Sequence, residues 1–212
     1  MNLKQLIQFS FLGGAIALIG CNTAAKEPSA SSTPTPTATS VKVIAASNLG
    51  MSTEEKTVLD KLLKDSKKVG FCGDSFNLEA AKRGSKVYKL ENQQYFVMLQ
   101  CFLAAYQGNY EFLVVNQQSA AKKPVTKLTV TEFAKNEAGK VQKMESPSIG
   151  GFPTYDPKQR VLTVNSKYRG LGDCGSKAKY QVQSTGLKLL EFKAKFACDG
   201  KLEPFQTVYT AK

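Results

Sequence analysis

Residues 95–103, Tyr-Phe-Val-Met-Leu-Gln-Cys-Phe-Leu, form an almost wholly apolar run between two polar segments. A short apolar run bounded by turn residues is typical of a strand that is buried on both faces of a sheet. Asn92-Gln93 supplies the turn before it, and Gly108-Asn109 supplies the turn after it. The chain then returns through Glu111–Asn116, so these residues predict a β-hairpin with a buried central strand.

Short strand patterns continue on both sides of this hairpin. Turns are expected around Gly139, at Tyr155–Lys158 and at Thr185-Gly186, and a loop is expected at Ser146–Gly151. The further predicted strands are Lys86–Glu91, Lys127–Phe133, Arg160–Asn165, Ala178–Ser184, Leu187–Lys195 and Phe205–Thr210. Short strands at regular spacing, joined by turns, indicate an antiparallel sheet.

Two helices are expected ahead of the strands. Ser52-Thr53-Glu54-Glu55 has the pattern of a capping box, and the apolar residues from Val58 to Leu63 then fall on one helical face. This predicts a helix over 53–65, and a shorter one is expected over Ser75–Arg83. The fold class is therefore α+β, mostly antiparallel β with one or two N-terminal helices.

The domain contains four cysteines, Cys72, Cys101, Cys174 and Cys198. An even number in an exported domain predicts two disulfides, which can form in three pairings. We favour Cys72–Cys101 and Cys174–Cys198, because each pair then lies within one half of the chain. The chain has no CxxC motif and no histidine, so disulfides are preferred to redox or metal chemistry at these residues.

The first twenty residues have the pattern of a secretion signal, with Lys4 ahead of an apolar run from Leu6 to Leu18. The run ends in Leu-Ile-Gly-Cys at residues 18–21, which resembles the lipobox of bacterial lipoproteins. The resemblance implies that the Cys21 thiol receives a diacylglycerol, that cleavage follows Gly20, and that palmitate-type acyl chains anchor the protein in a membrane. In Gram-negative lipoproteins an aspartate in the place of Asn22 favours the inner membrane, so the periplasmic face of the outer membrane is expected if the cell is Gram-negative.

Residues 21–51 predict the lipidated cysteine and a tether. Residues 22–40 are rich in Ala, Ser, Thr and Pro and contain no large apolar residue, so nothing there can offset the entropy lost on ordering. Residues 41–51 are more apolar and either add an edge strand or complete the tether. Residues 52–212 are expected to form a single domain.

Composition restricts the chemistry. The formal charge is +12 with no histidine, which removes Ser-His and Cys-His nucleophile pairs and histidine metal ligands. A basic envelope protein favours anionic neighbours such as lipid head groups, anionic polymers or acidic proteins. No nucleic acid partner, metal or cofactor is expected, and the lysines are scattered along the sequence rather than gathered in one run.

The second half resembles a bacterial envelope family that has an uncharacterised domain. The most specific element is Arg169-Gly-Leu-Gly-Asp-Cys-Gly175, and the matching residues before it include Cys101-Phe-Leu-Ala-Ala-Tyr106, Tyr155-Asp-Pro157 and Arg160-Val-Leu162. The match continues through Tyr180, Gly186, Leu189-Leu-Glu191 and Cys198, covering residues 85–200. A tryptophan usual in the family's strand after the motif is absent. The resemblance supports the Cys174–Cys198 pairing and implies no activity.

The favoured interpretation of Arg169–Gly175 is a tight turn that holds a disulfide. The alternative is that these residues form a binding or catalytic site. The expected function is a non-enzymatic, membrane-anchored binding domain with a basic, aromatic-bearing β surface. An inhibitor or accessory of cell-wall enzymes is one form of it. The candidate contacts are Tyr106, Tyr110, Tyr168 and Arg169.

Two alternatives stay open. Asp173, Glu191 and Asp199 are near the second pair of cysteines in the sequence, and two carboxylates can hydrolyse envelope glycans. The other alternative is a structural protein that stabilises a neighbouring envelope complex.

Overall fold

The computed structural model describes residues 50–118 and 123–212, which fall in one compact unit. The predicted signal 1–20, Cys21 and the tether up to residue 49 lie outside the described residues. The helices are α1 (Thr53–Val69) and α2 (Leu78–Gly84), with a 3₁₀ turn at Gly73–Ser75. The strands are β1 (Lys86–Lys89), β2 (Gln94–Leu103), β3 (Gly108–Asn116), β4 (Val125–Leu128), β5 (Val130–Lys135), β6 (Val141–Ser146), β7 (Ser148–Asp156), β8 (Val161–Lys167), β9 (Gly175–Val182), β10 (Leu187–Lys195) and β11 (Gln206–Thr210).

Helix α1 begins at the predicted capping box. The Ser52 side chain accepts the Glu55 N–H at 3.2 Å, and the Glu55 carboxylate accepts the Ser52 N–H at 2.7 Å. The helix ends at Val69, four residues beyond the predicted end, and its C-cap is Gly70, whose φ of 64° is left-handed. Helix α2 begins later than predicted, because Asn77 is its N-cap and accepts the Ala80 N–H. Within the described ranges, neither helix combines the length and apolar character needed to cross a bilayer.

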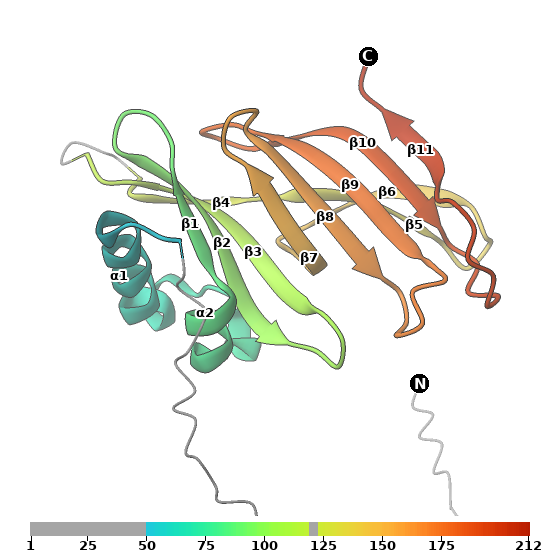
Figure 1. The fold of residues 1–212 in the computed structure, drawn as a ribbon, viewed down its shortest axis with the longest axis horizontal. Coiled ribbons are helices and arrows are strands. Elements are labelled where there is room, and N and C mark those ends of the chain that lie inside the picture. The colour runs from blue at the N-terminus through green and yellow to red at the C-terminus, as the bar shows by residue number, and fades with distance from the viewer. Residues whose placement is uncertain (1–49, 119–122) are drawn as a thin grey trace, which may run out of the picture. The chain divides into compact units, whose positions relative to one another are not determined.

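The strands form one large antiparallel sheet in the order β1-β2-β3-β7-β8-β9-β10-β11, with β4 also paired to β3 (Figure 1). β5 and β6 form a separate two-stranded sheet. The cysteines form the disulfides Cys72–Cys101 and Cys174–Cys198. The predicted fold class, antiparallel β with helices ahead of it and two disulfides, is confirmed.

The apolar run at 95–103 lies in β2 between two cores, as predicted. Phe96 and Met98 point into a core that continues to the strands β7–β10. Tyr95, Val97 and Leu99 point to the opposite face, where they pack against α1 and α2. Both faces of this strand are therefore buried, which is why its sequence does not alternate.

The predicted single strand Lys127–Phe133 is wrong. The chain is extended there, but it changes partner at Thr129: β4 pairs with β3, and β5 pairs with β6. Leu128 and Val130 are both buried in the same core. The apolar pattern thus reports burial correctly, but it carries no information about which strand lies alongside.

The loop predicted at Ser146–Gly151 is also wrong, because β7 begins at Ser148 and the exposed strand β6 ends at Ser146. The glycines indicated a loop but instead allow close strand packing. A Cβ on Gly151 would lie 2.7 Å from the Asn165 carbonyl oxygen. The next turn starts later than predicted, because β7 continues to Asp156.

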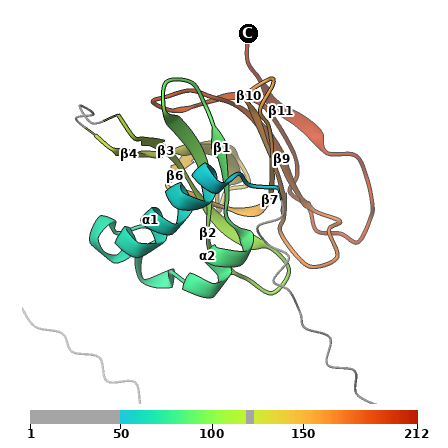
Figure 2. The same ribbon diagram turned by 60° about the vertical axis from the view of Figure 1, so that its left-hand side comes forward.

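The helices cover only one end of the sheet. They contact β1 and β2, and Figure 2 shows both helices beside these strands, away from β9 and β10. Cross-strand register places the outward residues of β7–β10 on this same side of the sheet. Within the described part of the chain, no helix packs on β7–β10.

Candidate functional site

The uncovered side of β7–β10 carries a basic, polar surface that we call the lysine face. Strand β8, and β9 from Ser176 onward, alternate between buried and outward residues, with Leu162, Val164 and Ala178 among those facing the core. The lysine face consists of Phe152, Thr154, Thr163, Asn165, Lys167, Lys177, Lys179, Gln181, Lys188, Glu191 and Lys193. Half-buried and exposed positions therefore display lysines, amides and hydroxyls on a rigid sheet.

Strand register arranges these residues in rows. Asn165 lies opposite Lys177, and Lys177 lies opposite Lys193. In the neighbouring row of the same two strands, β9 and β10, Lys179 lies opposite Glu191. Two lysines therefore stand directly opposite each other on adjacent strands, an arrangement that destabilises a sheet.

One acid partly compensates this charge. Glu191 forms ion pairs with Lys179 and Lys193, each at 3.2 Å. Burial opposes its ionisation, but hydrogen bonds from these two lysines lower the pKa of Glu191 overall. Lys177 makes no ion pair with any acid in the described ranges. The face keeps a local positive excess around Lys177.

A shallow hollow of about 510 Å³ lies on the same side of the sheet, one row away from the opposed lysines. Its lining includes the hydroxyls of Thr154 and Thr163 and the ammonium group of Lys179. The Asp156 carboxylate at its end accepts the N–H groups of Lys158 and Gln159, which fixes the β7–β8 turn. Val161 and Leu190 also line the hollow, which therefore combines hydrogen-bonding groups with apolar side chains.

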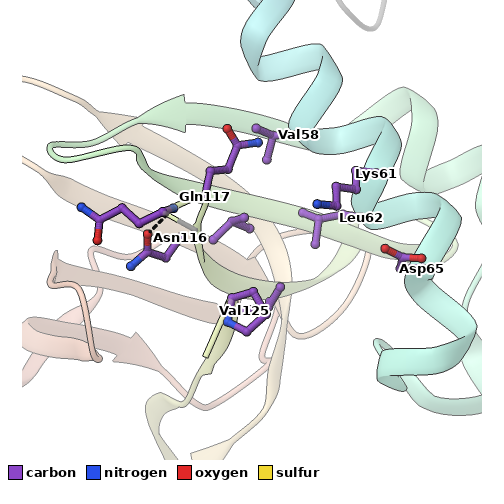
Figure 3. Close-up of a pocket in the computed structure, with 10 residues that line it drawn as sticks. Val58, Lys61, Leu62, Asp65, Asn116, Gln117 and Val125 are labelled. Carbon is purple, nitrogen blue, oxygen red and sulfur yellow. Dashed lines mark hydrogen bonds between the residues drawn. The ribbon is translucent and has the colours of Figure 1, made fainter. Parts of the chain in front are cut away.

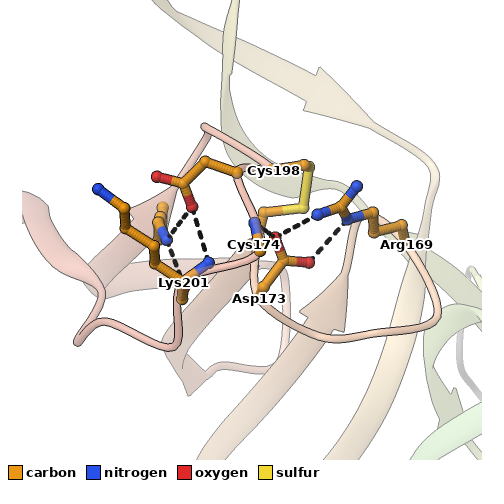
Figure 4. Close-up of a disulfide and its surroundings, with 8 residues drawn as sticks. Arg169, Asp173, Cys174, Cys198 and Lys201 are labelled. Carbon is orange, nitrogen blue, oxygen red and sulfur yellow. Dashed lines mark hydrogen bonds and ion pairs between the residues drawn. A yellow bond between two sulfur atoms is a disulfide. The ribbon is translucent and has the colours of Figure 1, made fainter.

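The Arg169–Gly175 motif folds around a buried acid (Figure 4). Asp173 is only 2% exposed. Its oxygens accept hydrogen bonds from Arg169 Nε at 2.7 Å, from Arg169 Nη2 at 2.5 Å and from the Gly200 N–H at 2.7 Å. The Arg169 guanidinium holds the pKa of Asp173 well below its usual range. The motif is thereby tied to the β10–β11 connection, to which Cys198 also belongs.

The other acids near this disulfide are also engaged with cations. Lys195 Nζ donates to Asp199 Oδ1 at 2.6 Å and to the Lys201 carbonyl oxygen at 2.5 Å. The Lys195 hydrogen bond lowers the pKa of Asp199. With Glu191 held by two lysines, each of the three carboxylates considered for hydrolysis carries an ion pair.

The glycines of the motif permit close contacts that connect it to the lysine face. A Cβ on Gly175 would lie 2.1 Å from the Ser166 carbonyl oxygen, and Gly172 has a left-handed φ of 72°. The Lys167 side chain runs past Gly172, and its Nζ lies 5.8 Å from the Phe152 ring centroid. The motif therefore helps to position one lysine of the face.

The predicted contacts divide into two groups. Tyr106 lies against Gly170, close in sequence to Tyr168 and Arg169. Tyr168 stacks on Phe196 along a groove of about 340 Å³ that Glu132 also lines. Arg169 is engaged by Asp173, as described above. Tyr110 does not join them, because it is half-buried in β3 and packs against the core, where burial raises its pKa.

Charged side chains also gather at two other places in the described residues. A cavity of about 470 Å³ lies between α1 and the end of β3 (Figure 3). Its charged lining residues, Lys61 and Asp65, have opposite signs, so it has no net charge. Elsewhere, the Glu111 carboxylate accepts the Cys72 N–H at 2.9 Å and lies 3.7 Å from Lys127 Nζ. The two sulfurs near this carboxylate, those of Cys72 and Cys101, are bonded to each other in a disulfide.

The sequence predicts a basic β surface, but it does not identify the residues of the lysine face. Its lysines are scattered along three strands, and only the register between the strands brings them together. The usable signal was the alternation in Lys177-Ala-Lys179-Tyr-Gln181, where every second residue is polar. Such alternation identifies an outward face but not its neighbours.

The family model described as "Protein of unknown function (DUF1176)" matches residues 17–212. The chain is also similar to the "Uncharacterized protein YpfG" of Escherichia coli (strain K12), with 26% identity over 174 residues. This match covers 82% of the chain and 47% of that relative, so the chain spans about half of the relative's length. No solved structure matches the chain. Since the family model covers most of its length, the chain belongs to the DUF1176 family of proteins of unknown function.

Proposed function

We propose that this protein is a membrane-anchored envelope lipoprotein whose domain binds an anionic partner through the lysine face. The observation that carries the proposal is the opposed pair Lys177 and Lys193 on adjacent strands. Because like charges at this spacing repel, a bound anion would relieve the repulsion and gain favourable contacts. An inhibitor or accessory of cell-wall enzymes is one role that such a domain can serve.

The membrane anchor rests on the sequence at residues 18–21. A lipidated Cys21 would hold the basic domain close to anionic envelope components, which raises their effective concentration. Cells expressing the protein should incorporate radiolabelled palmitate into it. The variant Cys21→Ser should not be labelled, and an unlabelled wild-type protein would overturn the anchor.

We propose binding rather than catalysis because the carboxylates near the second disulfide form ion pairs with cationic side chains. Asp173 is bonded to Arg169, and Asp199 is bonded to Lys195. A general acid needs a raised pKa, whereas the pKa values of both groups are lowered. Release of reducing sugar from envelope glycans by the purified protein would favour the hydrolase instead.

The binding proposal is tested with calorimetry on the full chain. Tripolyphosphate and phosphatidylglycerol vesicles serve as two chemically different anions. The double variant Lys177→Gln, Lys193→Gln should bind either anion about tenfold more weakly, because each exposed charge contributes roughly 0.2–1 kcal/mol.

The matched control carries Lys56→Gln and Lys64→Gln on the exposed side of α1, and it loses the same charge away from the face. Its affinity should stay within about twofold of wild type, since these charges lie outside the face. Equal loss in both double variants, or no binding of either anion by wild type, would contradict the proposal.

A further inference from the structure

We infer that the anion bound by the lysine face is an acidic glycan, a chain of sugar residues that bear carboxylate groups. This inference rests on the proposed function and names the chemical class of its partner. Its basis is the combination of the opposed lysines with the hydroxyl-lined hollow one row away.

The side chains of the face fit a polar ligand better than a protein or a bilayer. Protein interfaces depend on a buried cluster of aromatic or arginine anchors. Insertion into a bilayer depends on an apolar surface. The large exposed apolar side chain of the face is Phe152, at its β7 edge and 44% exposed. The remaining surface is formed mainly by lysines, hydroxyls and amides.

The hollow provides the hydrogen bonds that sugar hydroxyls require. Thr154 and Thr163 lie opposite each other on β7 and β8, and Lys179 follows in the same row on β9. In the described residues, neither threonine hydroxyl has a protein hydrogen-bond partner at this site. Both hydroxyls are free to donate to and accept from a ligand.

The distance between the hollow and the lysine pair suits a short polymer. The two rows are two residues apart along the strands, which corresponds to about 7 Å. Adjacent strands are about 4.8 Å apart, so one carboxylate can reach the ammonium group of Lys177 and that of Lys193, which Glu191 also pairs at 3.2 Å. A sugar in the hollow can therefore place the carboxylate of a neighbouring sugar on the lysines.

Phe152 adds a flat surface at the end of the lysine row. It lies opposite Asn165, which lies opposite Lys177. The Lys167 ammonium group lies near its ring, 5.8 Å from the centroid. A sugar ring stacked on Phe152 would bring a carboxylate within reach of Lys167. The face thus repeats one recognition pattern, a sugar position next to an ammonium group.

The test measures binding of the full chain to four defined ligands by calorimetry. Oligogalacturonate is the acidic glycan, and its methyl ester is the same glycan without charge. Polyglutamate carries carboxylates without sugar hydroxyls, and phosphatidylglycerol vesicles present a lipid surface. The double variant Thr154→Val, Thr163→Val removes the hollow's hydroxyls and keeps every lysine, while Thr185→Val changes an exposed threonine in the β9–β10 turn.

Oligogalacturonate should bind most tightly of the four ligands. The Thr154→Val, Thr163→Val variant should bind it about tenfold more weakly and bind polyglutamate unchanged, because two hydrogen bonds are lost. Thr185→Val should match wild type. If polyglutamate or vesicles bind as well as oligogalacturonate and the valines change nothing, the glycan assignment is overturned and the proposed anion binding stands. If none of the charged ligands binds, both are overturned.

Discussion

Asp173 organises the Arg169–Gly175 motif at the level of single residues. A buried carboxylate is stable only when its oxygens are hydrogen-bonded and its charge is paired. Arg169 supplies two of these hydrogen bonds and Gly200 supplies the third. The acid, the disulfide and the glycines therefore act together to fix the β8–β9 connection.

Replacing Asp173 with Asn should lower stability and change its pH dependence. The folded-state pKa of Asp173 is depressed. Its contribution is therefore fully present above the unfolded pKa and is lost as the pH falls through the folded value. Urea unfolding of wild type should show stability falling as the pH drops below about 4, the ordinary carboxyl range.

The Asp173→Asn variant should show a shallower fall over the same acid range, measured from its lower starting stability. Asp199→Asn is the comparison, since Asp199 pairs with Lys195 at a more exposed position. Identical pH profiles for wild type and Asp173→Asn would show that this carboxylate does not stabilise the fold.

A substitution at Gly175 tests how closely β8 and β9 approach each other. A Cβ there would meet the Ser166 carbonyl oxygen at 2.1 Å, so Gly175→Ala should cost about 1–3 kcal/mol. Gly186→Ala is the matched control, because nothing lies within 4 Å of the added Cβ. It should leave stability unchanged or raise it slightly. Equal thermal unfolding temperatures for both variants would contradict this packing.

Local sequence signals predicted the secondary-structure elements well where burial follows one clear pattern. The capping box located the start of α1, and the strand Leu187–Lys195 agrees with β10. Prediction failed where pairing or close packing decides the structure. Thr129 separates strands of two different sheets, and Gly150-Gly151 lies within a strand because β8 approaches closely. Neither the change of partner at Thr129 nor the strand at Gly150-Gly151 follows from the secondary-structure propensities of the residues there.

The opposed lysines give an element-level prediction that links stability to binding. Lys177→Gln removes the repulsion with Lys193 across β9 and β10, so unfolding free energy should rise by roughly 0.2–1 kcal/mol. The same change should weaken tripolyphosphate binding, because an ammonium group is lost. Chemical denaturation and calorimetry on the same samples measure both effects. A variant that loses stability while binding unchanged would contradict a functional role for the pair.

Across the whole molecule, the helices and the lysine face share one side of the sheet. Helices α1 and α2 bury that side at β1 and β2, and within residues 50–118 and 123–212 no helix covers it at β7–β10. The candidate site could not be predicted from sequence, since it depends on long-range register between β7, β8, β9 and β10. The predicted contacts Tyr106 and Tyr168 lie near the motif instead, and Lys167 lies next to both regions.

An anion bound on the lysine face should change the surroundings of its lysines and leave α1 as it is. The most direct measurement is a titration of the isotope-labelled full chain with tripolyphosphate, followed by amide chemical shifts. Anion binding on the lysine face should give saturable shifts concentrated at Lys177, Lys179 and Lys193 and at their neighbours on β8, with α1 unaffected. Shifts concentrated on α1 or along the groove at Tyr168, or no saturable shift at all, would contradict it.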